Sequence, residues 1–184
     1  MKMKMRVTIA LMLVLMTVMA ACQVPMPLPT PPPSTPGEVA VPFATIALND
    51  SGGDIDITQH EIGGQPQVLL LTSPDQLAGL ESWVNPPTWA ALQQVDFQHD
   101  AVIALFRGRK PTTNYQTIIE QITKQDNRLM VYAQFWEPNP AYYASGAAIT
   151  SPYHVVKVAR QDLPSEQPEL VLAPTLITPT PPAN

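Results

Sequence analysis

The sequence has almost no cysteine, because Cys22 is the only one in 184 residues. One cysteine cannot form an intramolecular disulfide, and thiolate zinc sites need several ligands close together. The three histidines, His60, His99 and His154, are far apart and lack the i, i+4 spacing of a helical metal pair. We therefore expect no disulfide, no metal and no cofactor, and a fold stabilised by a packed core.

Catalytic motifs are also absent from the sequence. It contains no Gly-x-Ser-x-Gly turn, no glycine-rich phosphate loop and no second thiol that could serve as a nucleophile. A hydrolase that uses His154 with Asp96 or Asp100 is the remaining enzymatic alternative, but the sequence places no nucleophile beside them. We therefore expect a protein that is not an enzyme.

Basic residues are few, with ten Lys and Arg against fifteen Asp and Glu and a net charge of −5. A nucleic-acid ligand needs a concentrated basic patch. The one short basic cluster is Arg107, Arg109 and Lys110, so nucleic acid is not an expected partner. Three acidic residues lie close together at Asp50, Asp54 and Asp56, but the spacing and closing Glu of a calcium loop are missing. We interpret that stretch as a turn.

The N-terminus carries the order of residues that is typical of an export signal. Lys2, Lys4 and Arg6 precede an apolar run at residues 7–21, which ends in small residues just before Cys22. This run is shorter than the roughly 20 apolar residues that span a bilayer. The segment resembles the lipobox of bacterial lipoproteins, with Met19 where that motif usually has leucine. A plain signal peptide and an uncleaved membrane anchor are the alternatives.

The lipobox resemblance implies that Cys22 is lipidated and becomes the first residue of the mature chain. Acyl chains hold a protein at a membrane, since each buried methylene contributes about 0.8 kcal/mol. Loss of the signal would remove three of the ten basic residues and change the net charge from −5 to −8. We therefore predict an exported protein attached to the cell membrane or outer membrane through its N-terminal lipid.

Proline separates the rest of the chain into parts. Residues 22–42 hold many of the 22 prolines and predict a polyproline II linker. Residues 173–184 are again rich in proline and predict a disordered tail. Residues 43–172 lie between these segments and are long enough for one domain with its own core.

The central domain contains short runs rich in Val, Ile, Tyr and Phe, which are typical of strands. They lie at residues 44–48, 55–58, 67–72, 101–106, 115–122, 129–136 and 153–159. The run at 101–106 has no polar alternation, so we expect a central strand covered on both faces. Residues 124–128 predict a hairpin turn, with Asn127 suited to a positive φ.

One helix is expected after Ser73, because Pro74 suits the first helical position and Gln76 completes a capping box. Leu77, Leu80 and Val84 would share its apolar face. A second short helical turn is expected from Pro86 onward. Together these elements predict a mainly β or α+β domain, an antiparallel sheet or sandwich with one or two short helices.

Four segments carry a family resemblance. A Val-Asp-Phe at residues 95–97, the apolar strand at 101–106, the loop at 108–115 and the Thr-Ser-Pro-Tyr-His-Val-Val-Lys sequence that starts at Thr150 occur in this order. In this order the four segments resemble the C-terminal domain of the PrcB family, over most of residues 43–160. The resemblance implies a non-catalytic lipoprotein that associates with a secreted subtilisin-type surface protease. Thr113 and Asn114 stand where that family commonly has two glycines.

Two polar segments are the candidate partner-binding site, because each adjoins a predicted strand and we expect those two strands to be neighbours. Six of the candidate residues lie in the first segment and five in the second: Lys110, Pro111, Thr112, Thr113, Asn114, Tyr115, Thr150, Ser151, Pro152, Tyr153 and His154. The first segment is also similar to a loop of chagasin-type cysteine-protease inhibitors, which insert loops into a protease cleft. The alternative function is therefore protease inhibition through residues 110–115. Simple structural turns are the third interpretation.

Overall fold

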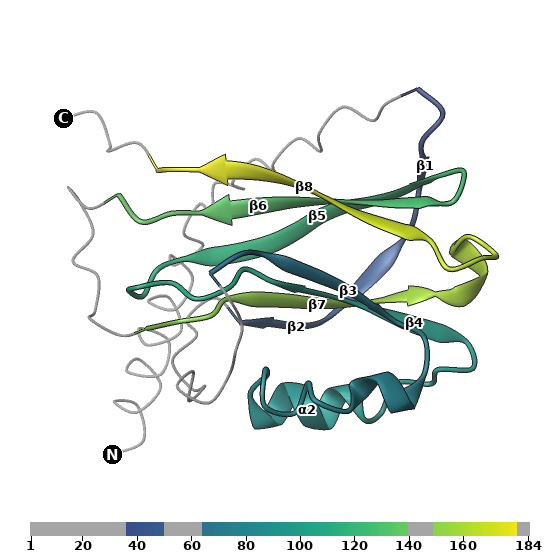
Figure 1. The fold of residues 1–184 in the computed structure, drawn as a ribbon, viewed down its shortest axis with the longest axis horizontal. Coiled ribbons are helices and arrows are strands. Elements are labelled where there is room, and N and C mark those ends of the chain that lie inside the picture. Colours follow the sequence, from purple (N-terminus) through teal and green to yellow (C-terminus); the bar gives the residue numbers. More distant parts are fainter. Residues whose placement is uncertain (1–35, 50–63, 140–148, 180–184) are drawn as a thin grey trace, which may run out of the picture. The chain divides into compact units, whose positions relative to one another are not determined.

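The computed structural model describes residues 36–49, 64–139 and 149–179 and shows two sheets that face each other (Figure 1). The predicted signal, Cys22 and the acidic stretch at residues 50–56 lie outside these ranges. One sheet has the order β1 (Val39–Ala40), β5 (Gln116–Gln125), β6 (Arg128–Trp136) and β8 (Glu169–Ile177). The other has the order β2 (Phe43–Asn49), β7 (Tyr153–Ala159), β4 (Asp100–Phe106) and β3 (Gln67–Leu71).

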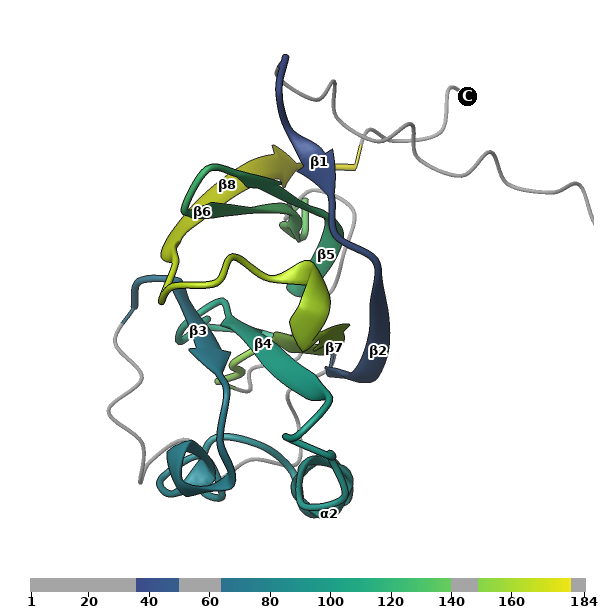
Figure 2. The same ribbon diagram turned by 90° about the vertical axis from the view of Figure 1, so that its right-hand side faces the viewer.

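The mainly β fold predicted from the sequence is confirmed. Neighbouring strands are antiparallel except for β6 and β8, which run in parallel. A parallel neighbour cannot be reached by a tight hairpin. The chain instead leaves β7 through the 3₁₀ turn η3 (Arg160–Asp162) and crosses the end of the sandwich to reach β8 (Figure 2).

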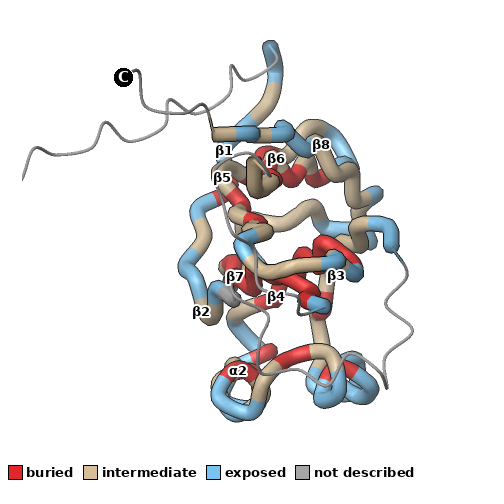
Figure 3. The backbone as a smooth tube through the Cα atoms, turned by 90° about the vertical axis from the view of Figure 1, so that its left-hand side faces the viewer, coloured by how far each residue is buried: buried red, intermediate tan, exposed pale blue. Residues whose placement is uncertain are grey.

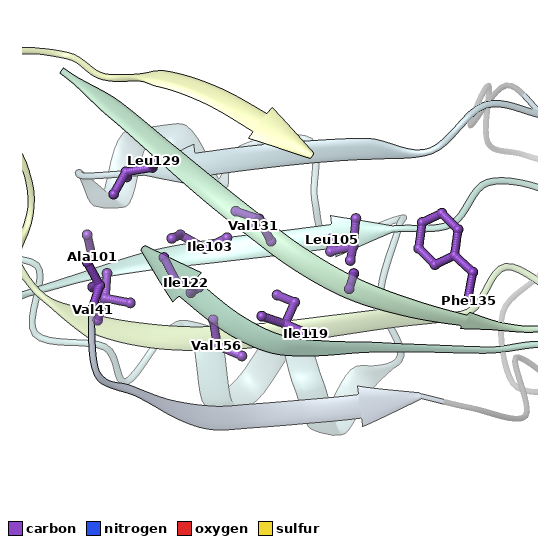
Figure 4. Close-up of a cluster of buried hydrophobic side chains, with 12 residues drawn as sticks. Val41, Ala101, Ile103, Leu105, Ile119, Ile122, Leu129, Val131, Phe135 and Val156 are labelled. Atoms are coloured by element: carbon purple, nitrogen blue, oxygen red, sulfur yellow. The ribbon is translucent and has the colours of Figure 1, made fainter. Parts of the chain in front are cut away.

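Strand β4 is covered on both faces, as its continuous apolar sequence predicts. Ala101, Ile103 and Leu105 pack between the sheets with residues of β5, β6 and β7 (Figure 4). Val102, Ala104 and Phe106 pack on the opposite face against the helical segment. Figure 3 shows this burial at the middle of the second sheet. The loop that follows β4 therefore begins from a rigid support.

The two sides of the sandwich differ. On one side the chain passes directly from β1 in the first sheet to β2 in the second (Figure 2). Between them, buried Val41 donates its amide hydrogen to the carbonyl of Ile122 at 2.8 Å. On the other side β3 and β8 are edge strands, and no strand of the described residues joins them.

The helix predicted after Ser73 is only partly present. The segment forms the 3₁₀ helix η2 (Pro74–Leu77), in which the Gln76 side chain accepts from the amide of Ser73. Gly79 then has a φ of +95°, which a right-handed helix does not allow, and the chain continues as turns. Leu77, Leu80 and Val84 are nevertheless buried against the sheet, so the predicted apolar face is correct.

The second helical turn forms α2 (Pro86–Leu92). Asn85 caps it, because its side-chain oxygen accepts from the amide of Thr88 at 2.9 Å. None of the helices in the described residues is long and apolar enough to cross a membrane.

Strand structure extends beyond the predicted domain at both ends. Strand β1 lies in the predicted linker, and β8 runs to Ile177, past the start of the predicted disordered tail. Pro174 is tolerated in β8 because this strand lies at the edge of its sheet, where no further strand needs the missing amide. The hairpin between β5 and β6 is confirmed, although Asp126 and not Asn127 has the positive φ, of 51°. The predicted strand at residues 55–58 lies outside the described residues.

Candidate functional site

The two predicted partner-binding segments lie side by side. Strands β4 and β7 pair with Phe106 opposite Tyr153, so the chain leaving β4 runs beside the chain entering β7. Lys110 and Thr150 form an antiparallel bridge with N···O distances of 2.7 and 2.9 Å. The reason for the proximity differs from the predicted one, because β5 and β7 belong to different sheets and the neighbours are β4 and β7.

The loop at residues 110–115 is exposed at its tip and fixed at its base. The hydroxyl of Thr150 donates to the carbonyl of Thr112 at 2.9 Å. Asn114 has a φ of 72°, which asparagine tolerates better than most residues. Pro111 and Asn114 are exposed, while Lys110, Thr112, Thr113 and Tyr115 are partly buried. A partner can therefore contact this loop without reordering it.

The second segment is buried. Thr150 and Ser151 are each 1% exposed, Tyr153 is 0% and His154 is 3%, and Pro152 is buried as well. The hydroxyl of Tyr153 lies 2.9 Å from that of Thr88 and accepts from the amide of Asn85 at 3.2 Å. The sequence placed residues 150–154 in the candidate partner-binding site, and the structure shows that they are buried. Thr150 bonds directly to the loop, through its backbone and its hydroxyl.

His154 joins three strands inside the sandwich. The amide of Ile119 in β5 donates to its Nδ1 at 2.8 Å, so the ring carries its proton on Nε2. Nε2 then donates to the hydroxyl of Thr45 in β2 at 2.9 Å. Both partner strands have a register shift at this level, next to Ile119 and after Thr45. Burial lowers the pKa of His154 to about 4, which keeps the imidazole neutral near pH 7.

Arg107 belongs to the site as well, although in the sequence it stood out only as a member of the short basic cluster and not as a candidate site residue. Its side chain is 1% exposed and lies between the two sheets. Nη1 donates to the carbonyls of Gln116 and Trp136, at 2.8 and 2.7 Å, and Nη2 donates to Glu137 Oε1 at 2.8 Å. Gln116 and Trp136 are paired across β5 and β6. One guanidinium from the second sheet therefore caps the end of a strand pair in the first.

Aromatic rings enclose the Arg107 guanidinium. Its central carbon lies 4.6 Å from the centre of the Phe135 ring and 5.4 Å from that of Tyr115. The ammonium of Lys110 lies 5.8 Å from the centre of the same Tyr115 ring. Desolvation lowers the pKa of both basic groups, and Glu137 opposes this shift. The Tyr115 ring therefore lies near two cations, the buried guanidinium of Arg107 and the partly buried ammonium of Lys110.

A signal for Arg107 was present in the sequence. In a strand every second residue faces the same side. Ala101, Ile103 and Leu105 face the sheet interior, and one further step of the same alternation reaches Arg107. Burial of Arg107 was not predicted, because arginine is rarely buried unless it is paired.

A shallow pocket of about 280 Å³ adjoins the loop on the side of β6. Trp136, Glu137 and Pro138, at the end of β6, line it together with Asn114 and Gln116 at the start of β5 and Pro179 after β8. The pocket therefore combines an aromatic ring, two prolines and polar groups, a mixture that suits contact with another protein.

The three residues of the hydrolase alternative each pair with other groups of the structure. His154 bonds to Thr45 and Ile119, whereas Asp96 accepts from His99 at 2.7 Å and Asp100 pairs with Lys157 at 3.0 Å. The side-chain arrangement that the hydrolase alternative requires, His154 with Asp96 or Asp100, is therefore not formed. Within the described residues, no three His, Cys, Asp or Glu side chains form a group that could hold a metal ion.

Comparison with protein families gives one result for this part of the chain. Residues 101–159 match the family model described as PrcB C-terminal. This match confirms the predicted resemblance to the PrcB family, over a shorter stretch than residues 43–160. It includes the loop at 110–115 and the segment at 150–154, and it begins after residues 95–97. No curated protein and no solved structure matches the chain.

Proposed function

We propose, from the match of residues 101–159 to the PrcB C-terminal family, that this chain is a non-enzymatic component of a surface protease complex. In this proposal Cys22 carries a lipid that holds the exported domain at the membrane. The loop at residues 110–115 contacts a secreted subtilisin-type protease. Residues 150–154 hold that loop in place and do not touch the partner.

The observation that carries the proposed contact is the rigid base of an exposed loop. The Lys110–Thr150 bridge and the Thr150–Thr112 hydrogen bond fix the loop from one side, and buried Arg107 fixes the strand ends beneath it. A loop that is already ordered loses little conformational entropy on binding. Its exposed residues, Pro111 and Asn114, are therefore available for a specific contact at low cost.

The charge near the loop suggests the chemistry of the partner surface. Arg107, Arg109 and Lys110 lie within four positions of the sequence, and Glu137 neutralises one of them. The surroundings of the loop are thus basic in a chain whose net charge is −5. Such a local reversal of charge favours an acidic or carbonyl-rich partner surface and speeds encounter at low salt.

A co-purification experiment tests the contact. The wild-type lipoprotein is compared with a loop variant, Pro111→Ala with Asn114→Gly, in which glycine keeps the positive φ possible. Gln93→Ala with Gln94→Ala, two exposed positions after α2, is the matched control. We expect the loop variant to lose at least tenfold of the co-purified protease and the control to lose none. Equal recovery in all three preparations would remove the loop from the interface.

The lipid anchor is tested separately with Cys22→Ser. We expect this variant to remain unacylated and to keep residues 1–21, which intact-mass measurement of the extracted protein detects. A processed, membrane-extracted species of wild-type mass would reject Cys22 as the lipid site. This experiment does not depend on the protease contact.

The same loop supports a second candidate function, protease inhibition. The observation that favours it is the exposure of Pro111 and Asn114 on a hydrogen-bonded support, since a rigid loop can enter an active-site cleft. An inhibitor would slow hydrolysis of a small peptide substrate by the bound protease. A complex component that binds elsewhere would leave this rate unchanged.

A further inference from the structure

The outer edge of β3 exposes main-chain groups in a defined pattern. The amide of Arg107 donates to the carbonyl of Pro152, so the odd-numbered residues of β4 face β7 and the even-numbered ones face β3. Leu69 and Leu71 lie opposite Ala104 and Val102 and bond toward β4. Val68 and Leu70 must then direct their amides and carbonyls away from the sheet.

Thr72 is the next residue whose main-chain groups point away from the sheet. Side chains, and not a neighbouring strand, bond to these groups. Its amide donates to Gln76 Oε1 at 2.6 Å and its carbonyl accepts from Arg160 Nη1 at 3.3 Å. The main-chain groups of Val68 and Leu70 have no equivalent partner strand within the described residues, because β3 is the last strand of its sheet. An edge with free donors and acceptors is suited to pairing with another extended chain.

A groove of about 710 Å³ lies along this edge, between β3 and the segment at residues 160–170 that leads into β8. Its apolar lining includes Val68, Leu70, Leu163 and Leu170, whose side chains also pack against the core between the sheets. Arg160 and Glu166 also line the groove, so its charged groups balance. The groove therefore favours an uncharged, partly apolar occupant.

We propose that the groove receives an extended peptide segment of another protein, which adds to β3 as a further strand. The main-chain groups of Val68 and Leu70 bond to the peptide backbone. Alternate apolar side chains of the peptide pack on Leu163 and Leu170. This is recognition by strand addition, in which backbone bonds give affinity and alternate side chains give specificity.

A comparison with β8, the edge strand on the same side of the sandwich, shows why β3 is the acceptor there. Strand β8 contains Pro174, which has no amide to donate, and begins with charged Glu169. Proline and charged residues are the usual protection of an edge strand against pairing. The β3 sequence Gln-Val-Leu-Leu-Leu contains neither. The proposal concerns a surface separate from the loop at residues 110–115 and does not rest on the protease contact.

A backbone-methylated peptide pair tests the proposal with the full chain. The probe is a short capped peptide of alternating Val and Thr with a Lys at each end. One modified form carries N-methyl groups on the Val amides and the other on the Thr amides. An added strand bonds through only one of these two sets. We expect one methylated form to bind at least tenfold more weakly than the unmodified peptide and the other to bind equally.

Amide hydrogen exchange shows where the peptide binds. We expect the amides of Val68 and Leu70 to exchange rapidly in the free protein and at least tenfold more slowly with the unmodified peptide. The amides of Leu69 and Leu71, which bond to β4, should be slow in both states. Val68→Lys should weaken peptide binding at least tenfold, and Thr175→Lys on the exposed β8 edge is the matched control that should not.

Four results would overturn the proposal. They are failure of the unmodified peptide to bind, equal binding of all three peptides, slow exchange of Val68 and Leu70 in the free monomer, and a dimer of this chain that buries the same two amides. The methylated peptides keep the test valid if Val68→Lys unfolds the protein, because they leave the chain unchanged.

Discussion

The two faces of β4 are buried by different chemistry. The face that carries Val102, Ala104 and Phe106 packs against leucines and aromatic rings of the helical segment, and its buried hydroxyls, on Thr88 and Tyr153, bond to each other. The opposite face lies between the sheets. There the apolar residues are joined by two buried polar side chains, the guanidinium of Arg107 and the imidazole of His154.

The two faces of β4 therefore contribute differently to the stability of the fold and to the alignment of the two sheets. Apolar contacts have no direction and stabilise the fold in proportion to the area that they bury. Hydrogen bonds to Arg107 and His154 require set distances between strands of both sheets. We infer that the helix-facing side mainly contributes stability, whereas the polar groups between the sheets fix how one sheet lies on the other.

The largest expected effect is that of Val102→Asp on the apolar face. Val102 is 0% exposed, and an unpaired buried carboxylate costs several kcal/mol. We expect a loss of more than about 4 kcal/mol in the free energy of unfolding, so the domain should not fold at 37 °C. Circular dichroism of the purified variant checks this. A cooperative thermal transition near the wild-type temperature would contradict the burial of this face.

The next largest effect is a loss of stability at low pH caused by His154. Its pKa is about 4 in the folded protein and 6.5 in the unfolded chain, so between these values only the unfolded chain takes up the proton. Stability should therefore be full above about pH 6.5, fall as the pH decreases, and level off below about pH 4. The total loss for this group is about 3 kcal/mol.

Urea unfolding at several pH values measures this loss. Acidic residues also titrate near pH 4, so the wild type is compared with His154→Gln. The difference between the two stability curves isolates the histidine. Parallel curves from pH 7 to pH 4 would show that the ring is accessible to protons in the folded protein.

Arg107→Met should have a smaller effect of a different kind. The substitution keeps most of the side-chain volume but leaves the carbonyls of Gln116 and Trp136 without their donor. We expect a loss of about 2 kcal/mol, together with chemical-shift changes in residues 110–116. Shift changes confined to the substituted residue would mean that the guanidinium does not position the loop.

Tyr153→Phe should have the smallest effect of the four. It removes one hydroxyl from the helix-facing side and leaves the Thr88 hydroxyl and the Asn85 amide without that partner. We expect a loss of about 1 kcal/mol in chemical denaturation and no shift changes in the loop. A loop response equal to that of Arg107→Met would erase the proposed distinction between the two faces.

The sequence was most informative where a residue's type matched its environment. The apolar run at residues 101–106 identified the central strand, and Leu77, Leu80 and Val84 identified a buried face even though the helix itself did not form beyond Leu77. The positive φ of Gly79 prevents the helix from continuing, and the sequence alone does not reveal the φ of a glycine. Strand β8 was missed because proline usually excludes a strand, whereas an edge position permits it.

The candidate site was predicted only in part, because the type of a residue does not always reveal its environment. The proximity of residues 110–115 and 150–154 was expected, but the burial of Thr150 and Ser151 was not, since small hydroxyl residues occur both in exposed turns and in packed ones. The pairing of Arg107 with carbonyls of two other strands depends on tertiary contacts. No local pattern in the sequence specifies such contacts.

The passage of one chain segment from β1 to β2 has a mechanical consequence. Tension applied at residue 36 reaches β1 first, which pairs with β5 at only two positions and is secured by the Glu38 carboxylate, an acceptor from Thr123 and Tyr132. Beyond Val41 the tension meets β2, which pairs with β7 along most of its length. A pulled chain would therefore release β1 before the second sheet is disturbed, so the chain ahead of β2 lengthens while the fold around β2 and β7 stays intact.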